Sequence, residues 1–254
     1  PQGGCPLFGG AAPLLRRRVD RGAERGELIA RRLALRRRSS GDLLQATPPA
    51  VADPSRVRRA WRESWNATDE EYVFTLLGEP ARLLAGKLGE QPLLVLDAPG
   101  LFARDGSPYA DPAGLDWGDN WHRFAALARA AADIAGGAVK GLSFDLLHAH
   151  DWQAALAPAY LKYGKAHATP SVMTVHNLAF QGQYAADIFP ALGLHESAYS
   201  VDGVEYYGGV GYLKAGLQCA WAITTVSPTY AQEIRTPEFG MGLNGLINAR
   251  QGQV

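Results

Sequence analysis

The sequence has 254 residues, of which 47% are hydrophobic and 20% are charged, an ordinary composition for a soluble globular protein. No apolar run approaches the roughly 18 residues that a membrane-spanning helix needs, and the N-terminus lacks the apolar core of a signal peptide. We therefore expect a cytoplasmic protein with no membrane partner. Cys5 and Cys219 are far apart and fit no metal-binding spacing, so we expect two reduced, structural thiols.

The formal net charge of zero conceals an asymmetry along the chain. Residues 1–62 contain 14 Arg, no Lys and 5 acidic residues, a balance of +9, whereas residues 63–254 carry −9. The basic stretch RRRVDRGAERGELIARRLALRRR has no aromatic residue to stack on bases, so a solvated basic helix is favoured over a nucleic-acid-binding arm. The first Lys is Lys87, and such an Arg-rich, Lys-free stretch is also typical of out-of-frame translation of a GC-rich gene. We expect residues 1–75 to form an atypical basic segment that is disordered or frameshifted.

From about Leu76 onward the sequence has the pattern of regular secondary structure. Short apolar runs bounded by turn-forming residues predict strands, and apolar residues at helical spacing predict helices. Asp119 is the expected N-cap of the first helix, Gly136 and Gly137 should end it, and Pro158 should kink or shorten the second helix. In chain order, the expected elements are a strand within 91–100, a loop at 101–118, a helix at 119–137, a strand at 143–150, a helix at 152–164, a strand at 171–176, a helix at 211–220, a strand at 222–227 and a helix at 227–234.

This alternation of strands and helices predicts βαβ units, and hence an α/β protein with a doubly wound parallel sheet. Ligands of such sheets bind in the crevice beyond the carboxyl ends of the strands. The residues at these ends are therefore the first candidates for a functional site. They are His148, His150, Asp151, His176, Asn177 and Ser227.

The motif HAHDWQ has both a functional and a structural interpretation. His148 and His150 should point to the same side of their strand, as metal ligands would, but no Cys or HExxH helix supports a metal site. We therefore expect no bound metal. Asp151 precedes a helix that starts at Trp152, and a simple helix cap explains its position as well as a catalytic role does.

The other strand ends are weighed in the same way. A single His such as His176 is most often a satisfied core residue, although Asn177 and the Gly-containing loop after it favour a function. Ser227 stands before Pro228 in VSPT, which is typical of helix initiation, and no GxSxG is present. The chain also has no GxGxxG at a strand–helix turn, so a nicotinamide dinucleotide has no expected site.

Five blocks between about Leu76 and Arg250 carry a more specific pattern. They are LDAPGLFARDGSPYADPAGLDWGDNWHRFAAL, LLHAHDWQAALAPAYLKY, TVHNLAFQGQY, GVEYYGGVGYLKAGLQCAWAITTVSPTYAQEI and FGMGLNGLI. In this order and at this spacing they resemble the family of bacterial glycogen synthases and plant starch synthases.

The resemblance implies that residues 76–254 form part of the N-terminal catalytic domain of a GT-B glycosyltransferase, with a Rossmann-like sheet. It implies transfer of glucose from ADP-glucose to the non-reducing 4-hydroxyl of an α-1,4-glucan, with retention, in glycogen biosynthesis. ADP-glucose is then a substrate, the glucan is the second partner, and no cofactor, metal or nucleic acid is expected.

The resemblance also implies roles for individual residues. His176 should hydrogen-bond a hydroxyl of the transferred glucose and support the positive charge that develops at its reacting carbon, which is the charge of an oxocarbenium-like transition state. Asp151 is the second expected catalytic residue. The expected substrate-binding residues are Tyr109, Trp152, Asn177, Gln181 and Gly182.

The chain departs from the family pattern at both ends. The family begins with a strand and a Lys-Thr-Gly-Gly-Leu loop that helps to hold the nucleotide diphosphate, and Gly3-Gly4 is the nearest counterpart here. The family's C-terminal domain, which binds most of the ADP, has no counterpart before Val254. We therefore expect an incomplete, weakly active or inactive fragment. The alternatives are a non-catalytic glucan-binding remnant and another GT-B glycosyltransferase.

Overall fold

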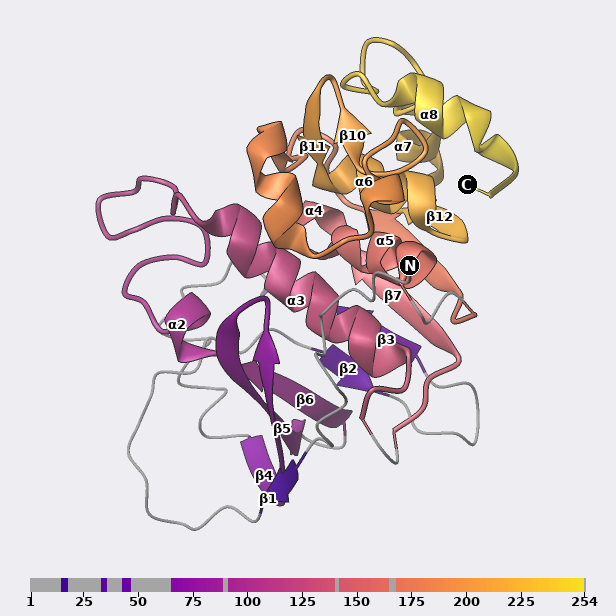
Figure 1. Ribbon diagram of the computed structural model, residues 1–254. Coiled ribbons are helices and arrows are strands. Elements are labelled where there is room, and N and C mark those ends of the chain that lie inside the picture. Colours follow the sequence, from indigo (N-terminus) through magenta and orange to yellow (C-terminus); the bar gives the residue numbers. More distant parts are fainter. Residues whose placement is uncertain are drawn as a thin grey trace, which may run out of the picture.

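The computed structural model describes residues 15–17, 33–35, 43–46, 65–88, 91–139, 142–164 and 168–253. Its centre is a nine-stranded sheet in the order β1-β4-β5-β6-β2-β3-β7-β8-β12 (Figure 1). One side of this sheet is parallel and the other is antiparallel. The parallel side consists of β3 (Leu43–Ala46), β7 (Leu146–His150), β8 (Ser171–Val175) and β12 (Ala222–Thr225).

The parallel side confirms the α/β class and the strands predicted around residues 146, 171 and 222. His150 pairs with Thr174, and Val175 pairs with Thr225, so the carboxyl ends of β7, β8 and β12 meet at one edge of the sheet. This register places the loops after β7 and β8 next to each other. The candidate residues at those strand ends are therefore brought together.

Of the antiparallel side, the sequence predicted only the strand β6 (Gln91–Asp97), and it placed that strand in a parallel sheet. The structure corrects this, because β6 is antiparallel to both of its neighbours, β5 and β2. The antiparallel side is built around a hairpin of β4 (Trp65–Leu76) and β5 (Glu79–Leu88). Leu77 and Gly78 form the turn, and both have positive φ, 48° and 89°. Such a two-residue turn can join only antiparallel strands. The change from antiparallel to parallel pairing occurs at β3, which is antiparallel to β2 and parallel to β7.

Two short strands of this sheet lie in the basic N-terminal stretch, namely β1 (Leu15–Arg17) and β2 (Leu33–Leu35). They pair with β4 and β6, respectively. The prediction of a basic helix is therefore wrong for these residues, because pairing with a neighbouring strand overrides local helix propensity. Most of the segment 1–75, and with it the expectation of disorder or a frameshift, lies outside the described residues.

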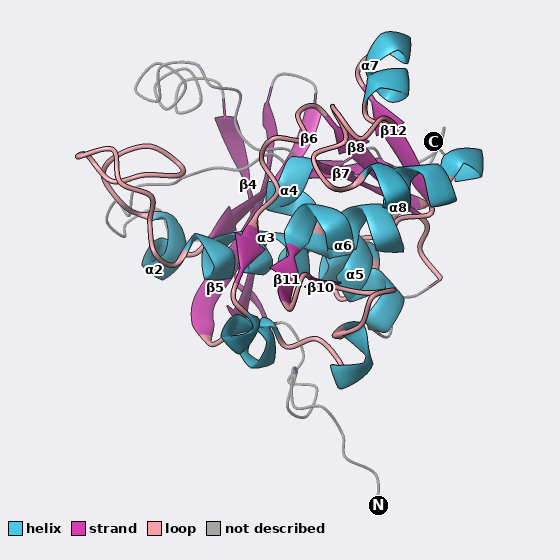
Figure 2. Cartoon of the chain, turned by 90° about the horizontal axis from the view of Figure 1, so that it is seen from above, coloured by secondary structure: helices cyan, strands magenta, loops and turns pink. Residues whose placement is uncertain are grey.

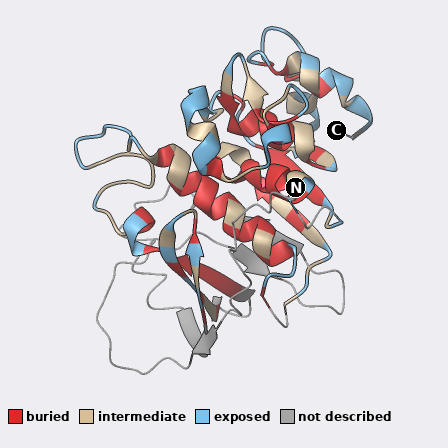
Figure 3. Ribbon diagram, in the orientation of Figure 1, coloured by how far each residue is buried: buried red, intermediate tan, exposed pale blue. Residues whose placement is uncertain are grey.

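Helix α3 (Asn120–Ala135) confirms the first predicted helix and lies between two apolar cores. Phe124, Ala128 and Ala131 belong to the core that includes residues of β7, β8 and the helix α5 (Leu156–Tyr163). Leu127 and Ala130 belong to a second core against the antiparallel strands. The helix is thus buried on two sides, and Figure 3 shows it buried along most of its length.

The start of α3 corrects one expectation. Asp119 occupies the N-cap position, but no side-chain hydrogen bond caps the helix. Its carboxylate instead receives two hydrogen bonds from Arg104, at 2.7 and 2.5 Å. A charged guanidinium is a stronger partner for a carboxylate than a backbone amide, so the ion pair replaces the cap.

The second predicted helix is divided, as Pro158 suggested. It consists of α4 (Asp151–Ala154) and α5 (Leu156–Tyr163), with a break at Ala155. Pro158 is the third residue of α5, where its missing N–H costs little. Helices α3, α4 and α5 contact one another and also β7, so they form one layer over the sheet (Figures 1 and 2).

The remaining elements follow the predicted order. The helix α6 (Tyr212–Cys219) and the strand β12 lie where the sequence predicts them. Arg250 donates hydrogen bonds to Leu217 O and Ala220 O at the end of α6. The other bounds are α2 (Pro99–Phe102), α7 (Pro228–Glu233), α8 (Asn244–Ala249), the 3-10 helices Ala186–Leu192, Glu196–Ala198 and Gln251–Gln253, and a small sheet of β9 (Gln183–Tyr184), β10 (Glu205–Tyr206) and β11 (Gly209–Gly211).

Candidate functional site

Asp151 and His176 form a hydrogen-bonded pair across the ends of β7 and β8. Asp151 Oδ1 accepts the backbone N–H of His176 at 2.8 Å, and Asp151 Oδ2 lies 2.9 Å from His176 Nδ1. A carboxylate can only accept, so Nδ1 carries the proton and Nε2 of the neutral ring is an acceptor. The imidazole is 46% exposed. The sheet thus presents an oriented imidazole to solvent, backed by a negative charge.

The backbone of Asp151 is unusual for a residue that carries a Cβ. Its φ is +53°, in the left-handed region, where Asp and Asn are the most tolerated residues after Gly. It is the first residue of α4, the N-cap residue is His150, and no side-chain hydrogen bond caps this helix. The helix-cap interpretation of Asp151 is therefore wrong. Both carboxylate oxygens are directed to His176, and left-handed backbone at such a position is typical of functional sites.

Two more imidazoles, those of His150 and His148, continue in a row from the His176 ring. The ring centroids of His148 and His150 are 4.1 Å apart, and those of His150 and His176 are 5.3 Å apart with nearly parallel planes. His148 and His150 share one face of β7, as strand alternation predicts. Burial, with the positive charges that His148 and His176 can carry, lowers the pKa of His150 to about 4. His150 is therefore neutral at pH 7 and contributes a flat ring, not a charge, beneath His176.

A chain of side-chain contacts crosses the same face of the sheet. His148 Nε2 lies 2.5 Å from Thr174 Oγ1, which lies 2.6 Å from Thr224 Oγ1. These residues come from β7, β8 and β12 in turn. This series of contacts was not expected from the sequence, because the pattern of one strand does not show which residue of the next strand lies beside it. These contacts hold the His148 ring, against which the His150 ring packs at a tilt of 37°.

Trp152 forms an aromatic wall next to Asp151. Its ring packs edge-on against Phe124 at 4.6 Å and lies 6.5 Å from the ring of Tyr109. Gly182 lies directly on the indole, since a Cβ there would come within 2.4 Å of Trp152 Cε3. With φ at +62°, Gly182 is required both by its backbone conformation and by this close approach. The missing side chain of Gly182 therefore allows the loop to pack closely on Trp152.

The loop after β8 is held by its own polar side chains. Asn177 Oδ1 accepts from Ala179 N at 2.9 Å, and Gln181 Nε2 donates to Leu178 O and to Met241 O at 3.1 and 2.9 Å. Tyr230 Oη accepts from Leu178 N at 2.9 Å. Asn177 and Gln181 thus shape the loop beside His176, and contacts with a substrate stay a prediction for both.

Ser227 is not part of the site. Its hydroxyl accepts from Tyr230 N at 3.0 Å and caps α7, which has Pro228 at its start. This confirms helix initiation as the role of the VSPT motif.

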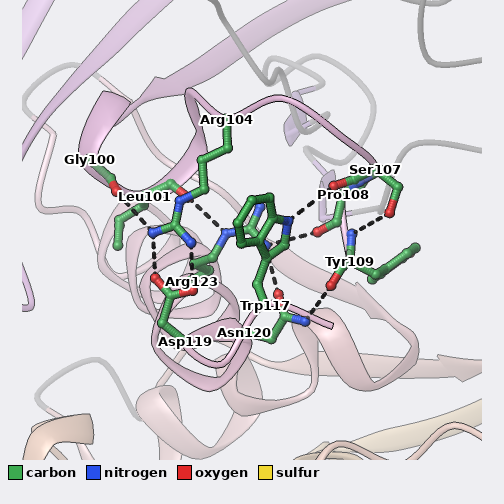
Figure 4. Close-up of polar contacts among 10 residues, drawn as sticks. All are labelled: Gly100, Leu101, Arg104, Ser107, Pro108, Tyr109, Trp117, Asp119, Asn120 and Arg123. Carbon is green, nitrogen blue, oxygen red and sulfur yellow. Dashed lines mark hydrogen bonds and ion pairs between the residues drawn. The ribbon is translucent and has the colours of Figure 1, made fainter. Parts of the chain in front are cut away.

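Tyr109 reaches the site from the loop between α2 and α3, residues 103–119. Its hydroxyl accepts from Gln153 Nε2 at 3.0 Å, and its ring faces Trp152 and Phe124. Figure 4 shows that polar contacts hold this loop from its inner side, including those from Asn120 and Arg123 on α3. The sequence singled out Tyr109 only through the family resemblance and gave no role to Gln153. Its place two residues after a candidate Asp in HAHDWQ was the one available signal for Gln153.

The described residues contain no group of three or more His, Cys, Asp or Glu arranged to hold a metal ion. In the same part of the chain, no helix has the length and apolar character needed to cross a membrane. Cys219 is a free thiol, and burial raises its pKa to about 11, so it is unreactive at neutral pH. Cys5 lies outside the described residues.

Comparison with known proteins agrees with this geometry. The family model described as the starch synthase catalytic domain matches residues 48–249. The glycogen synthase of Novosphingobium aromaticivorans is 67% identical over 183 residues, which is 71% of this chain and 38% of that protein. The glycogen synthase of Mesorhizobium japonicum is 56% identical over 221 residues, which is 84% of this chain and 46% of that protein. The chain spans less than half the length of these curated relatives.

A solved structure is similar as well. The catalytic domain of starch synthase IV from Arabidopsis thaliana, bound to ADP and acarbose, superposes with a TM-score of 0.64 and 26% sequence identity. The match covers 74% of this chain and 39% of that one. It confirms the Rossmann-like α/β sheet of a GT-B glycosyltransferase. The chain belongs to the starch synthase catalytic domain family, together with the bacterial glycogen synthases.

Proposed function

We propose that this chain supplies the acceptor-side part of an ADP-glucose-dependent glucosyltransferase. The reaction transfers glucose to the non-reducing 4-hydroxyl of an α-1,4-glucan with retention, and neither a cofactor nor a metal takes part. The observation that carries the proposal is the exposed His176 imidazole at the carboxyl edge of a parallel sheet. Asp151 Oδ2 contacts its Nδ1, and Asp151 Oδ1 accepts from the backbone N–H of the same residue. The membership of the chain in a family of glycogen synthases supports the proposal. The cytoplasmic location stays a prediction.

The geometry suits stabilisation of charge in glycosyl transfer. An oxocarbenium-like transition state places positive charge on the reacting sugar. Nε2 of His176 accepts from a sugar hydroxyl, and the Asp151 carboxylate behind the ring makes that acceptor more electron-rich. Neither residue needs to form a covalent bond in this scheme. The wall formed by Trp152 and Tyr109 offers apolar surface to a sugar ring.

The proposal is tested in a chimera that has the full length of a relative. Residues 76–250 of this chain replace the matching segment of the Novosphingobium aromaticivorans glycogen synthase, and transfer of radioactive glucose from ADP-glucose to maltoheptaose is measured. His176→Ala should reduce kcat by about 100-fold or more, as the loss of a preorganised electrostatic contact does in other enzymes. Asp151→Asn keeps the left-handed backbone but weakens the orientation of the ring, and should reduce kcat by about tenfold.

Trp221→Ser is the matched control, because Trp221 is exposed at the opposite, amino end of β12. It should leave kcat unchanged. Near-normal turnover of His176→Ala would remove His176 from the catalytic site. A parent chimera that binds maltoheptaose but transfers no glucose would contradict the proposed reaction and leave glucan binding as the function.

A further inference from the structure

Arg123 is a buried cation, and its hydrogen bonds to described residues go to carbonyl and amide oxygens. Its side chain is fully buried, and it donates from Nε to Leu101 O at 2.8 Å and from Nη1 to Pro108 O at 3.0 Å. No hydrogen-bonding partner for Nη2 occurs among the described residues. Burial, with the nearby charge of Arg104, lowers the pKa of Arg123 to about 10, so it stays charged at neutral pH. A buried charge that is only partly satisfied is costly.

Asn120 connects this cation to Tyr109. Arg123 Nη1 donates to Asn120 Oδ1 at 2.6 Å, and Asn120 Nδ2 donates to the carbonyl oxygen of Tyr109 at 2.8 Å. The Arg123 contact fixes which end of the Asn120 amide faces Tyr109, because a guanidinium can only donate. Both side chains are buried on α3, so they form a rigid support (Figure 4).

Of the contacts made by the Tyr109 carbonyl, the one from Asn120 links the loop to α3. Trp117 N also donates to the Tyr109 carbonyl, at 3.0 Å, but Trp117 belongs to the same loop. The direct contacts of Asn120 and Arg123 join Pro108 and Tyr109 to the helix. They therefore determine how far the Tyr109 ring reaches toward Trp152 and Gln153, beside Asp151.

We propose that Arg123 and Asn120 are positioning residues, which hold Tyr109 in the geometry that the glucan-binding site requires. The inference rests on the proposed function, since the glucan is the ligand that Tyr109 would meet. Neither residue touches the substrate in this scheme. They act through the backbone of residues 108 and 109.

Asn120→Asp separates positioning from stability. The carboxylate keeps the acceptor for Arg123 and adds a negative charge beside the buried guanidinium and at the N-terminus of α3, which should preserve or raise the melting temperature. It replaces the donor to Tyr109 O with a second acceptor, so Tyr109 should move. In the 254-residue chain, the affinity for maltoheptaose measured by calorimetry should fall by about three- to tenfold, the range that loss of one buried hydrogen bond implies.

Arg123→Lys and Arg129→Gln complete the test. A Lys amine cannot bridge Leu101 O, Pro108 O and Asn120 Oδ1 together, so Arg123→Lys should lower both affinity and melting temperature. Arg129 lies on the same helix and pairs with Asp133 at 2.8 Å, away from the Tyr109 loop. Arg129→Gln should lower the melting temperature and leave the affinity unchanged.

Amide exchange distinguishes failure of this inference from failure of the proposed function. Asn120→Asp should speed exchange at Trp117, whose N–H is bonded to Tyr109 O, and leave β7 unchanged. If the parent binds maltoheptaose and Asn120→Asp binds it equally well, the inference is overturned. If the parent binds no maltoheptaose, the proposed function fails, and unchanged exchange at Trp117 would then overturn the positioning of Tyr109 as well.

Discussion

Two regions meet at the candidate site and are held in different ways. The ends of β7 and β8 place Asp151 and His176 by backbone pairing between parallel strands. The loop 103–119 has no strand of the large sheet among its described residues, and its links to α3 include side-chain contacts of Asn120 and Arg123 and the ion pair of Arg104 with Asp119. The first region is as rigid as the sheet. The second depends on a few polar contacts, and a single substitution can therefore alter it without unfolding the sheet.

The difference predicts where each region is sensitive. In the strand-end region, side chains are tightly packed and strained backbone is retained, so steric changes should be the most damaging. In the loop, changes of charge at Arg104 and Asp119 should matter, and added volume should matter little around Gly114, where nothing lies within 4 Å of an added Cβ. The following three substitutions test this contrast.

The largest effect is expected from an added methyl group at Gly182. Gly182→Ala should lower the free energy of unfolding by about 2–4 kcal/mol, because left-handed backbone costs an Ala about 1–2 kcal/mol and displacing Trp152 adds an overpacking term. Gly114→Ala is the control in the loop, where φ is +86° but nothing lies within 4 Å of an added Cβ. It should cost only about 1 kcal/mol in urea unfolding. Equal costs would show that Trp152 yields freely and that the strand-end region is not tightly packed.

The second effect is a pH dependence that comes from His150. Burial lowers its pKa to about 4, whereas an unfolded His has a pKa of about 6.5. Between these values the unfolded state binds the proton more tightly, so stability should fall as the pH drops from 6.5 to 4, by up to about 3 kcal/mol. His150→Asn should flatten this part of the stability curve in urea unfolding at stepwise pH. The other five histidines remain in both proteins, so an unchanged slope would show that His150 is not the group responsible.

The smallest effect is expected at the base of the loop. Burial alone would raise the pKa of Asp119, but the hydrogen bond and charge of Arg104 outweigh it and hold the pKa below its usual value. The stability from this pair is therefore present above the ordinary Asp pKa and lost as the pH falls through the lowered one. Asp119→Asn should cost about 0.5–1 kcal/mol at pH 7, since both side chains are partly exposed, and less at high salt. A cost independent of salt would argue that packing, not charge, holds the base of the loop.

Much of the strand-end region could be predicted from the sequence. The apolar runs before His148 and His176 are local signals, and the carboxyl ends of parallel strands always share one edge of the sheet. Asp151 and His176 could therefore be named together before any contact was known. Their roles came from the resemblance to a family, since strand ends alone leave a helix cap or a core histidine equally open.

The contacts among the side chains of the site could not be predicted from local sequence patterns. The row of His148, His150 and His176 depends on the register of β7 against β8, and the contacts of Thr174 depend on β12 as well. Register is set by pairing between segments that are distant in sequence. Gly182 was expected as a binding residue through the resemblance, and that role stays a prediction. Its close approach to Trp152 joins the loop after β8 to α4 and could not be predicted from either segment alone.

Hydrophobic periodicity and turn residues act locally, so the sequence was enough to predict the α/β class, the positions of β7, β8 and β12 along the chain and the residues at their carboxyl ends. Only the tertiary structure decided that Arg123 is buried. In an amphipathic helix a charged residue is expected to face water. Here the hairpin of β4 and β5 adds a second apolar core on another side of α3, so the helix has little solvent-facing surface. The guanidinium is directed to carbonyl groups of α2 and of the Tyr109 loop.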